Sequence, residues 1–255
     1  MKKVLLILVD GMRPDVLSGI CEYEKISKRG ALALDATTVY PSVTLPCHVS
    51  LFLGVEPNRH GTLTNTYVPQ VRPVKGICEA ISDAGKQCAL FYTWGELRDI
   101  CVPDSVSYSV FSKGALFGYD RADEEVTAAA IDYLNKNDVD FTFLYLGYPD
   151  FAGHRFGWLS DEYMHSVKES FKRIDRVLDS IGNEYTVIIT ADHGGHGRTH
   201  GTDMPEDMLI PIIAIGEEFK PGELLCDANI MDIAPTVAEL LSVKKNDEWE
   251  GKSLI

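Results

Sequence analysis

Basic residues are scarce in this sequence of 255 residues, which has 24 Lys and Arg against 38 Asp and Glu and a formal net charge of −14. A surface with this imbalance repels polyanions, which argues against binding to nucleic-acid polymers or to anionic membrane surfaces. An anionic substrate would therefore need a local source of positive charge. Bound cations can provide it, because they are often the largest charges in a site.

Long apolar runs and paired cysteine motifs are also missing. The apolar stretch Val4–Val9 is shorter than the hydrophobic segment of a secretory signal and far shorter than a membrane span, so we interpret it as a buried strand. The six cysteines include no CxxC pair, which favours reduced thiols in a cytoplasmic protein. The length and the 45% hydrophobic content suit one domain over 1–255, with a possible small insertion within about 58–120.

Short apolar runs alternate with amphipathic stretches, which is typical of an α/β fold with a mainly parallel central sheet and helices on both faces. The apolar runs are rich in Val, Ile, Leu and Phe, as expected for strands buried on both faces. The predicted strands are Lys3–Val9, Ala31–Val39, Gln87–Tyr92, Phe141–Leu146, Tyr185–Thr190 and Ile210–Ile215. The predicted helices are Leu45–Leu53, Pro73–Ala84, Arg121–Asn135, Asp161–Ile181 and Ile230–Leu241.

Three of the predicted strands run into a segment that contains an aspartate, and these residues are Asp10, Asp150 and Asp192. In open parallel sheets ligands bind outside the carboxyl ends of the strands, so we expect the three side chains to meet at one edge. Carboxylates brought together repel one another unless a cation lies between them. The strand ends therefore predict a cation site.

Histidines gather close to two of these aspartates. Residues 191–201 contain His193, His196 and His200 among four glycines, and imidazole with carboxylate is a good ligand set for zinc. His154 follows Asp150 by four residues, so both can face one ion if the segment is helical or turn-like. The alternatives are a mobile polar loop without an ion at 191–201 and a hydrogen-bonded loop at 150–154.

Thr44 lies at the predicted start of a helix, where the helix dipole favours negative charge. A free threonine hydroxyl is a poor nucleophile, and metal coordination is one recognised way to activate it. The alternative is a plain helix N-cap. A nucleophilic pair of Cys47 and His48 is disfavoured, because neighbours on a helix point in different directions, and we interpret Cys47 as a small packed thiol.

Other polar residues receive structural assignments. We expect His60 and His165 to be structural or surface residues, and we expect a solvated face at Asp203, Glu206 and Asp207. Several aromatic residues could line a pocket or pack in the core, namely Tyr67, Phe91, Tyr92, Trp94 and Trp158.

Five motifs together resemble the alkaline phosphatase superfamily, and in particular its nucleotide pyrophosphatase/phosphodiesterase branch, which also includes phosphonoacetate hydrolase. In chain order they are Val9–Arg13, Pro41–His48, Pro149–His154, Ala191–Gly194 and His200–Gly201. The resemblance covers the whole chain, because Met231–Thr236 looks like the start of the closing helix of the family.

The resemblance implies two divalent metal ions, zinc in preference to manganese. One ion would be held by Asp10, Thr44, Asp192 and His193, with Thr44 as the nucleophile, and the other by Asp150, His154 and His200. Asn65 falls where this branch has an asparagine that donates to a phosphate oxygen. His196 competes with His200 as the last ligand, and His200 is favoured because the ligand of the family is followed by glycine.

The implied activity is hydrolysis of a small-molecule phosphate ester by a phosphodiesterase or nucleotide pyrophosphatase-type enzyme, through a phospho-threonine intermediate. The alternatives are a phosphonate hydrolase, a phosphomonoesterase or phosphomutase, and a non-catalytic zinc-binding member. A mutase would need basic side chains for a second phosphate, and near the motifs the sequence offers Arg13, Arg155 and Arg198. A sulfatase is disfavoured because Thr44 cannot become the formylglycine that sulfatases require.

Overall fold

The fold is built on one seven-stranded sheet in the order β2-β7-β6-β1-β5-β3-β4, seen in a computed structural model that describes residues 2–255. Neighbouring strands pair in parallel except at β7, which is antiparallel to both β2 and β6. The strands are β1 (Lys3–Val9), β2 (Ala31–Thr37), β3 (Cys88–Tyr92), β4 (Tyr108–Phe111), β5 (Phe141–Leu146), β6 (Tyr185–Thr190) and β7 (Leu209–Ile215). The predicted α/β class with a mainly parallel sheet is confirmed.

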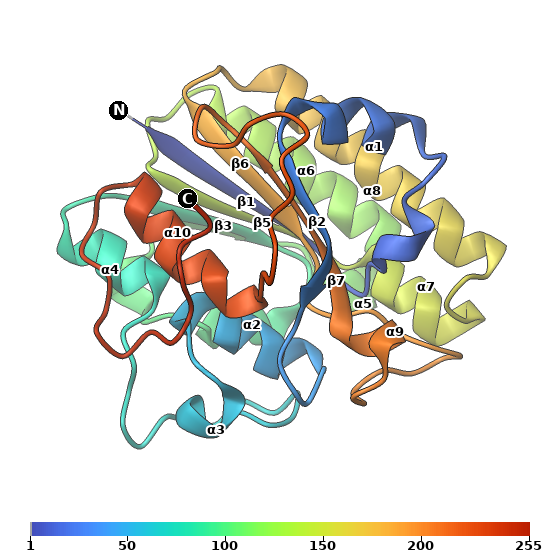
Figure 1. The fold of residues 1–255 in the computed structure, drawn as a ribbon, viewed down its shortest axis with the longest axis horizontal. Coiled ribbons are helices and arrows are strands. Elements are labelled where there is room, and N and C mark those ends of the chain that lie inside the picture. The colour runs from blue at the N-terminus through green and yellow to red at the C-terminus, as the bar shows by residue number, and fades with distance from the viewer. Residues whose placement is uncertain (1) are drawn as a thin grey trace.

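Helices cover both faces of the sheet, with α1, α6 and α8 on one side and α2, α4 and α10 on the other (Figure 1). The α-helices are α1 (Cys21–Ile26), α2 (Thr44–Leu53), α3 (Pro57–His60), α4 (Ile77–Asp83), α5 (Gly114–Phe117), α6 (Tyr119–Leu134), α7 (Tyr148–Phe156), α8 (Asp161–Ser180), α9 (Pro205–Met208) and α10 (Ile233–Leu240). Five short 3-10 helices are η1 (Pro14–Val16), η2 (Ser27–Arg29), η3 (Gly95–Asp99), η4 (Pro103–Ser105) and η5 (Ile230–Asp232). Within 2–255, none of the helices has the length and apolar character that crossing a membrane requires.

The longest helix, α8, follows directly from its sequence. The Ser160 side chain accepts a hydrogen bond from the Tyr163 backbone amide, which caps the first turn. Asp161 and Glu162 place negative charge at the positive end of the helix dipole. The buried apolar residues recur with a helical period at Val167, Phe171, Ile174 and Leu178.

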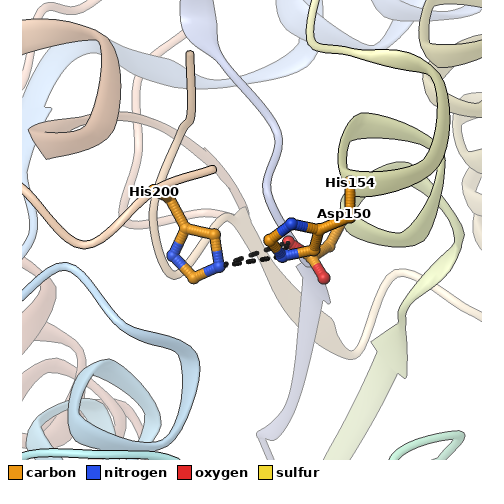
Figure 2. A group of neighbouring side chains, drawn as sticks. All are labelled: Asp150, His154 and His200. Atoms are coloured by element: carbon orange, nitrogen blue, oxygen red, sulfur yellow. Dashed lines mark hydrogen bonds and ion pairs between the residues drawn. The ribbon is translucent and has the colours of Figure 1, made fainter. Parts of the chain in front are cut away.

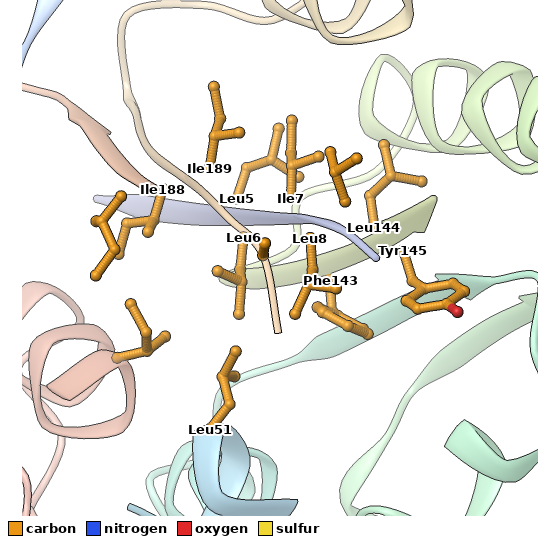
Figure 3. Packing of buried hydrophobic residues seen from close by; sticks show 14 of the residues in the cluster. Leu5, Leu6, Ile7, Leu8, Leu51, Phe143, Leu144, Tyr145, Ile188 and Ile189 are labelled. Atoms are coloured by element: carbon orange, nitrogen blue, oxygen red, sulfur yellow. The ribbon is translucent and has the colours of Figure 1, made fainter. Parts of the chain in front are cut away.

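The core lies on both sides of β1, the central strand. Its side chains alternate between the two faces, and Figure 3 shows Leu6 pointing toward Leu51 of α2 while Ile7 points to the opposite side. Both leucines are fully buried. This packing fixes α2 against the sheet, with the first residue of α2, Thr44, at the carboxyl edge of the strands.

Several element boundaries differ from prediction. The edge strand β4 was not predicted, because Tyr108–Phe111 is largely exposed and lacks the apolar run that marks the inner strands. The helix predicted from Pro73 begins at Ile77, where the Glu79 side chain accepts a hydrogen bond from the Gly76 amide and closes the first turn. Within 58–120, both β3 and β4 belong to the central sheet.

Candidate metal centre

Asp10, Asp150 and Asp192 meet at the carboxyl edge of the sheet, because β1 lies between β5 and β6. The Gly11 amide donates to Asp192 Oδ1 at 3.2 Å. Gly11 has a φ of +68°, and a Cβ added there would lie 3.0 Å from the Asp150 Cα. Glycine is therefore required at this position both by its left-handed backbone and by the close approach of α7.

A first cluster is formed by Asp10, Asp192 and His193, all of which are buried. His193 Nε2 lies 3.4 Å from Asp10 Oδ1 and 3.3 Å from Asp192 Oδ2. Thr44 Oγ1 lies 3.1 Å from the same His193 nitrogen. The cluster therefore places a hydroxyl beside two carboxylates and an imidazole.

A second cluster is formed by Asp150, His154 and His200, which Figure 2 shows converging from α7 and from the loop after β6. His200 Nε2 lies 3.2 Å from His154 Nε2 and 3.7 Å from Asp150 Oδ1. The His154 side chain is 44% exposed, so this cluster opens to solvent. The His193 and His200 rings stack with centroids 3.7 Å apart, which makes the two clusters immediate neighbours.

The backbone sets the tautomers of the three clustered histidines. Each ring points Nδ1 at a carbonyl oxygen, which can only accept, so Nδ1 carries the proton and Nε2 presents a lone pair. The acceptors are Gly194 for His193, Arg198 for His154 and Ser42 for His200, at 2.8, 3.0 and 2.8 Å.

These donors fit divalent cations. Asp10 Oδ1, Asp150 Oδ1 and Asp192 Oδ2 are buried without a hydrogen-bond partner, although such atoms in proteins are nearly always satisfied. The Nε2 atoms of His154 and His200 face each other as two lone pairs, which cannot form a hydrogen bond. Bound cations would satisfy all of these atoms, and carboxylate with imidazole is a ligand set suited to zinc.

The electrostatics of the clusters point the same way. Burial and the charges of Asp192 and Asp150 raise the pKa of Asp10 well above its ordinary value. Burial and the charge of Asp150 raise the pKa of Asp192 to about 8. Burial and the neighbouring His200 lower the pKa of His193. A cation held between these groups would favour ionised carboxylates and neutral imidazoles, which are the states that bind metal.

His196 belongs to neither cluster. Its Nδ1 lies 2.7 Å from Asp207 Oδ1, and Asp207 also accepts from the Thr202 amide and hydroxyl at 2.9 and 2.7 Å. Asp207 is fully buried, so the prediction of a solvated position was wrong for this residue, whereas Asp203 is exposed as predicted and Glu206 is partly exposed. The error arose because the surrounding segment is polar and no apolar period marks the residue as interior.

Replacing His200 with alanine is expected to reduce the bound metal by about one ion per chain, because the second cluster loses one of its three ligands. His196→Ala is the matched control, since it removes a histidine of the same loop that pairs with Asp207 instead. Elemental analysis of both purified variants measures the difference. Metal loss in His196→Ala with full retention in His200→Ala would reverse this choice of ligand.

The Thr44 side chain does not cap α2. The N-cap of α2 is Val43, and no side-chain capping bond is made there. The Leu45 amide donates to Asn65 Oδ1 at 2.9 Å, which brings the exposed Asn65 from a distant loop to the start of α2. The amide nitrogen of Asn65 remains available as a donor beside Thr44.

Cys47 and His48, which follow Thr44 on α2, are both buried, and His48 Nδ1 lies 3.4 Å from Asp192 Oδ2. Cys47 is buried with Sγ directed at backbone carbonyls. His48 is buried, its Nδ1 bonds the Thr44 carbonyl at 2.8 Å, and its ring packs against Tyr145. They form no nucleophilic pair. His60 is buried against the Ser50 hydroxyl at 3.0 Å, as expected for a structural histidine.

Trp158 joins the segments that carry the clusters. Its indole nitrogen donates to the Gly11 carbonyl at 3.0 Å. A Cβ added at Gly153 or Gly195 would lie 2.7 or 2.2 Å from its ring atoms. The centroids of the Trp158 and His154 rings are 5.2 Å apart. Trp158 therefore packs in the core behind the site.

Two supporting residues were missed by sequence reasoning. Asp123 of α6 is fully buried and accepts from the Gly147 and Tyr148 amides at 2.9 and 3.0 Å, which fixes the first turn of α7. Burial raises the pKa of Asp123 to about 7. Tyr145 donates its hydroxyl to Asp10 Oδ2. Both contacts join residues far apart in the chain, so no local sequence signal could have marked them.

Comparison with known proteins agrees with this geometry. Residues 104–245 match the family model described as the metalloenzyme superfamily. The chain belongs to this superfamily. Residues 4–84, which include Asp10, Thr44 and Asn65, match type I phosphodiesterase/nucleotide pyrophosphatase. The resemblance to the alkaline phosphatase group is thereby confirmed.

Phosphopentomutases from several bacteria are among the curated relatives of this metalloenzyme. That of Symbiobacterium thermophilum is 26% identical over 78% of this chain and 48% of its own length. That of Acetivibrio thermocellus is 31% identical over 62% of this chain and 38% of its own length. The chain thus spans about half or less of the length of the curated relatives that it matches.

Among solved structures, murine ectonucleotide pyrophosphatase/phosphodiesterase 5 aligns with a TM-score of 0.81 at 16% identity. The alignment covers 98% of this chain and 98% of that one. At this identity the likeness establishes the shared alkaline phosphatase-like fold, and the chemistry has to be argued from the site.

Proposed function

We propose that this metalloenzyme cleaves phosphate esters through a phosphorylated Thr44, with phosphate monoesters as its preferred substrates. The observation that carries the proposal is the position of Thr44 Oγ1, 3.1 Å from His193 Nε2 and beside the Asp150–His154–His200 cluster. A hydroxyl at the junction of two cation sites is the arrangement that an in-line phosphoryl transfer requires.

The roles of the residues follow from their positions. Asp10, Asp192 and His193, with Thr44, would hold one cation, and Asp150, His154 and His200 would hold the other. When bound, such cations supply positive charge for the phosphoryl oxygens and for the departing oxygen.

Thr44 performs the first displacement. As the first residue of α2 it lies in the positive field of the helix N-terminus, which favours the ionised hydroxyl oxygen. Its oxygen forms a bond to phosphorus while the ester P–O bond breaks. The proton lost by the Thr44 hydroxyl passes to solvent, and the departing alkoxide takes up one proton from solvent to leave as the alcohol. Asn65, which the Leu45 amide holds at the start of α2, donates to a phosphoryl oxygen, and removal of such a donor typically costs on the order of 100-fold in rate.

The second displacement regenerates Thr44. The leaving group departs on the side of His154, where the site opens to solvent. Water entering by this opening attacks phosphorus, and the Thr44 O–P bond breaks to release inorganic phosphate. If the departed alcohol or another hydroxyl took the place of water, the same phospho-threonine would support phosphoryl transfer to it.

The preference for monoesters is supported by the curated relatives. Those of Symbiobacterium thermophilum and Acetivibrio thermocellus are named phosphopentomutases, and a phosphopentose is a phosphate monoester. The second candidate is a phosphodiesterase, favoured by the type I phosphodiesterase match over 4–84. Arg13 is engaged by Asp15 and the Gly195 carbonyl and is not available to bind the second phosphate of a mutase substrate, whereas Arg155 and Arg198 are exposed.

Two chromogenic substrates distinguish the candidates. We expect kcat/KM for p-nitrophenyl phosphate to exceed that for bis-p-nitrophenyl phosphate by about tenfold or more, as differential transition-state binding allows. Both rates are measured with zinc present and again with a chelator. A preference for the diester would establish the second candidate, and chelator-resistant turnover of both would contradict a metal-dependent mechanism.

A further inference from the structure

An aromatic pair adjoins the solvent-open side of the second cluster. Phe151 directly follows Asp150 in α7, and its ring stacks on Tyr119 with centroids 5.2 Å apart and planes at 23°. Phe151 is 41% exposed. Phe151 and His154 are three residues apart on the helix, so they share one face. The exposed phenyl ring therefore flanks the partly exposed imidazole.

Tyr119 is held firmly in place at the end of β5. A Cβ added at Gly147 would lie 3.0 Å from ring atoms of both Tyr119 and Tyr145, and one added at Gly114 would lie 2.5 Å from Tyr119. Tyr145 in turn donates its hydroxyl to Asp10. The Tyr119 ring is thus packed between α5 and α7 and supports Phe151 from behind, beside the carboxylates of the site.

Carboxylates lie on the Tyr119 side of the pair, and the exposed Arg155 lies four residues after Phe151 on α7. Asp150 lies in the first turn of α7, and Asp123 lies beneath this turn. Asp120 directly follows Tyr119 in the chain. The nearby Arg121 guanidinium lies 5.9 Å from the Phe117 ring centroid, and Glu125 pairs with it at 2.8 Å. The exposed aromatic face of the pair offers stacking and no charged contact, so the ligand group that it favours is an uncharged ring.

We propose that Tyr119 and Phe151 form a leaving-group subsite, which takes a neutral ring carried by the ester beside the Asp150–His154–His200 cluster. The inference rests on the proposed function, because it assigns the side on which the leaving group departs. The ring can be an aryl group or a sugar, since both present a flat or gently puckered face that stacks on an aromatic side chain. Phe151 lies within the Pro149–His154 motif without a role of its own there, and its pairing with Tyr119 appears only in the fold.

Three phosphate monoesters and matched variants test the subsite. The substrates are phenyl phosphate, ribose 5-phosphate and ethyl phosphate, and phosphate release is measured with zinc present. Phe151→Ala is expected to lower kcat/KM for a ring-bearing ester about 3- to 10-fold relative to ethyl phosphate, which matches the loss of one aromatic contact. A decrease in kcat/KM for phenyl phosphate alone identifies an aryl subsite. A decrease in kcat/KM for ribose 5-phosphate alone identifies a sugar subsite.

The controls separate recognition from folding. Phe156→Ala removes a phenylalanine of the same helix with 42% exposure, and it should leave the ratio between substrates unchanged. Phe151→Tyr keeps the ring and should retain the preference. Equal changes for all three substrates in Phe151→Ala would overturn the subsite while leaving the proposed function intact. A wild-type protein inactive on all three would instead contradict the proposed function.

Discussion

Thr44→Ala is expected to lower kcat for phosphate-ester cleavage by roughly 10⁴-fold or more, the scale seen when a catalytic nucleophile is removed. The reason is local, because Thr44 Oγ1 is the hydroxyl beside His193, at the junction of the two clusters. The remaining ligands of the first cluster come from the segments that follow β1 and β6, so the variant should keep its metal. Steady-state rates on the wild-type and variant proteins, with metal content measured in parallel, test both expectations.

Thr44→Ser is the matched variant, since it keeps a hydroxyl at the first position of α2. We expect it to retain measurable turnover and to become labelled when it is quenched during turnover of a ³²P-labelled ester. Thr44→Ala should carry no label. Activity of the alanine variant close to that of wild type would exclude Thr44 as the nucleophile, and label on another residue would show which group replaces it.

Removal of bound metal by a chelator is expected to reduce turnover to the uncatalysed background, and addition of zinc should restore it. The structure also predicts a loss of stability. Asp10, Asp150 and Asp192 present buried oxygens without partners, and cations that bind only the folded state stabilise it by mass action. The midpoint of thermal unfolding should therefore fall when chelator is added and recover with zinc.

Thr44→Ala provides the control for this second prediction, because it lacks activity but retains the carboxylate and imidazole ligands. Its unfolding midpoint should respond to chelator in the same direction as that of wild type. A midpoint insensitive to chelator in both proteins, together with full activity, would show that the buried carboxylates are stabilised in another way.

The sheet and the convergence of the aspartates could be predicted because their signals are local. Buried parallel strands appear as unbroken apolar runs, and β1, β5 and β6 were predicted with the bounds that the structure shows. Since parallel strands end at one edge, the residues that follow them must approach one another. Asp10 and Asp192 could thus be placed together although they are far apart in the chain.

The supporting contacts could not be predicted because they depend on packing between distant elements. Asp123 looks like an ordinary helix carboxylate in the sequence, and only the fold shows it accepting from the Gly147 amide. The pairing of His196 with Asp207, and of Tyr119 with Phe151, is likewise tertiary. The choice of His200 over His196 was suggested by family resemblance, and the structure supplies a physical reason for it.

The central claim is that the two clusters are cation sites, and metal content tests it most directly. Elemental analysis of protein purified without chelator or nickel should find about two divalent ions per chain, one for each cluster. His200→Ala should hold about one fewer. Protein that contains no divalent metal, and that binds none when zinc is added, would contradict the account.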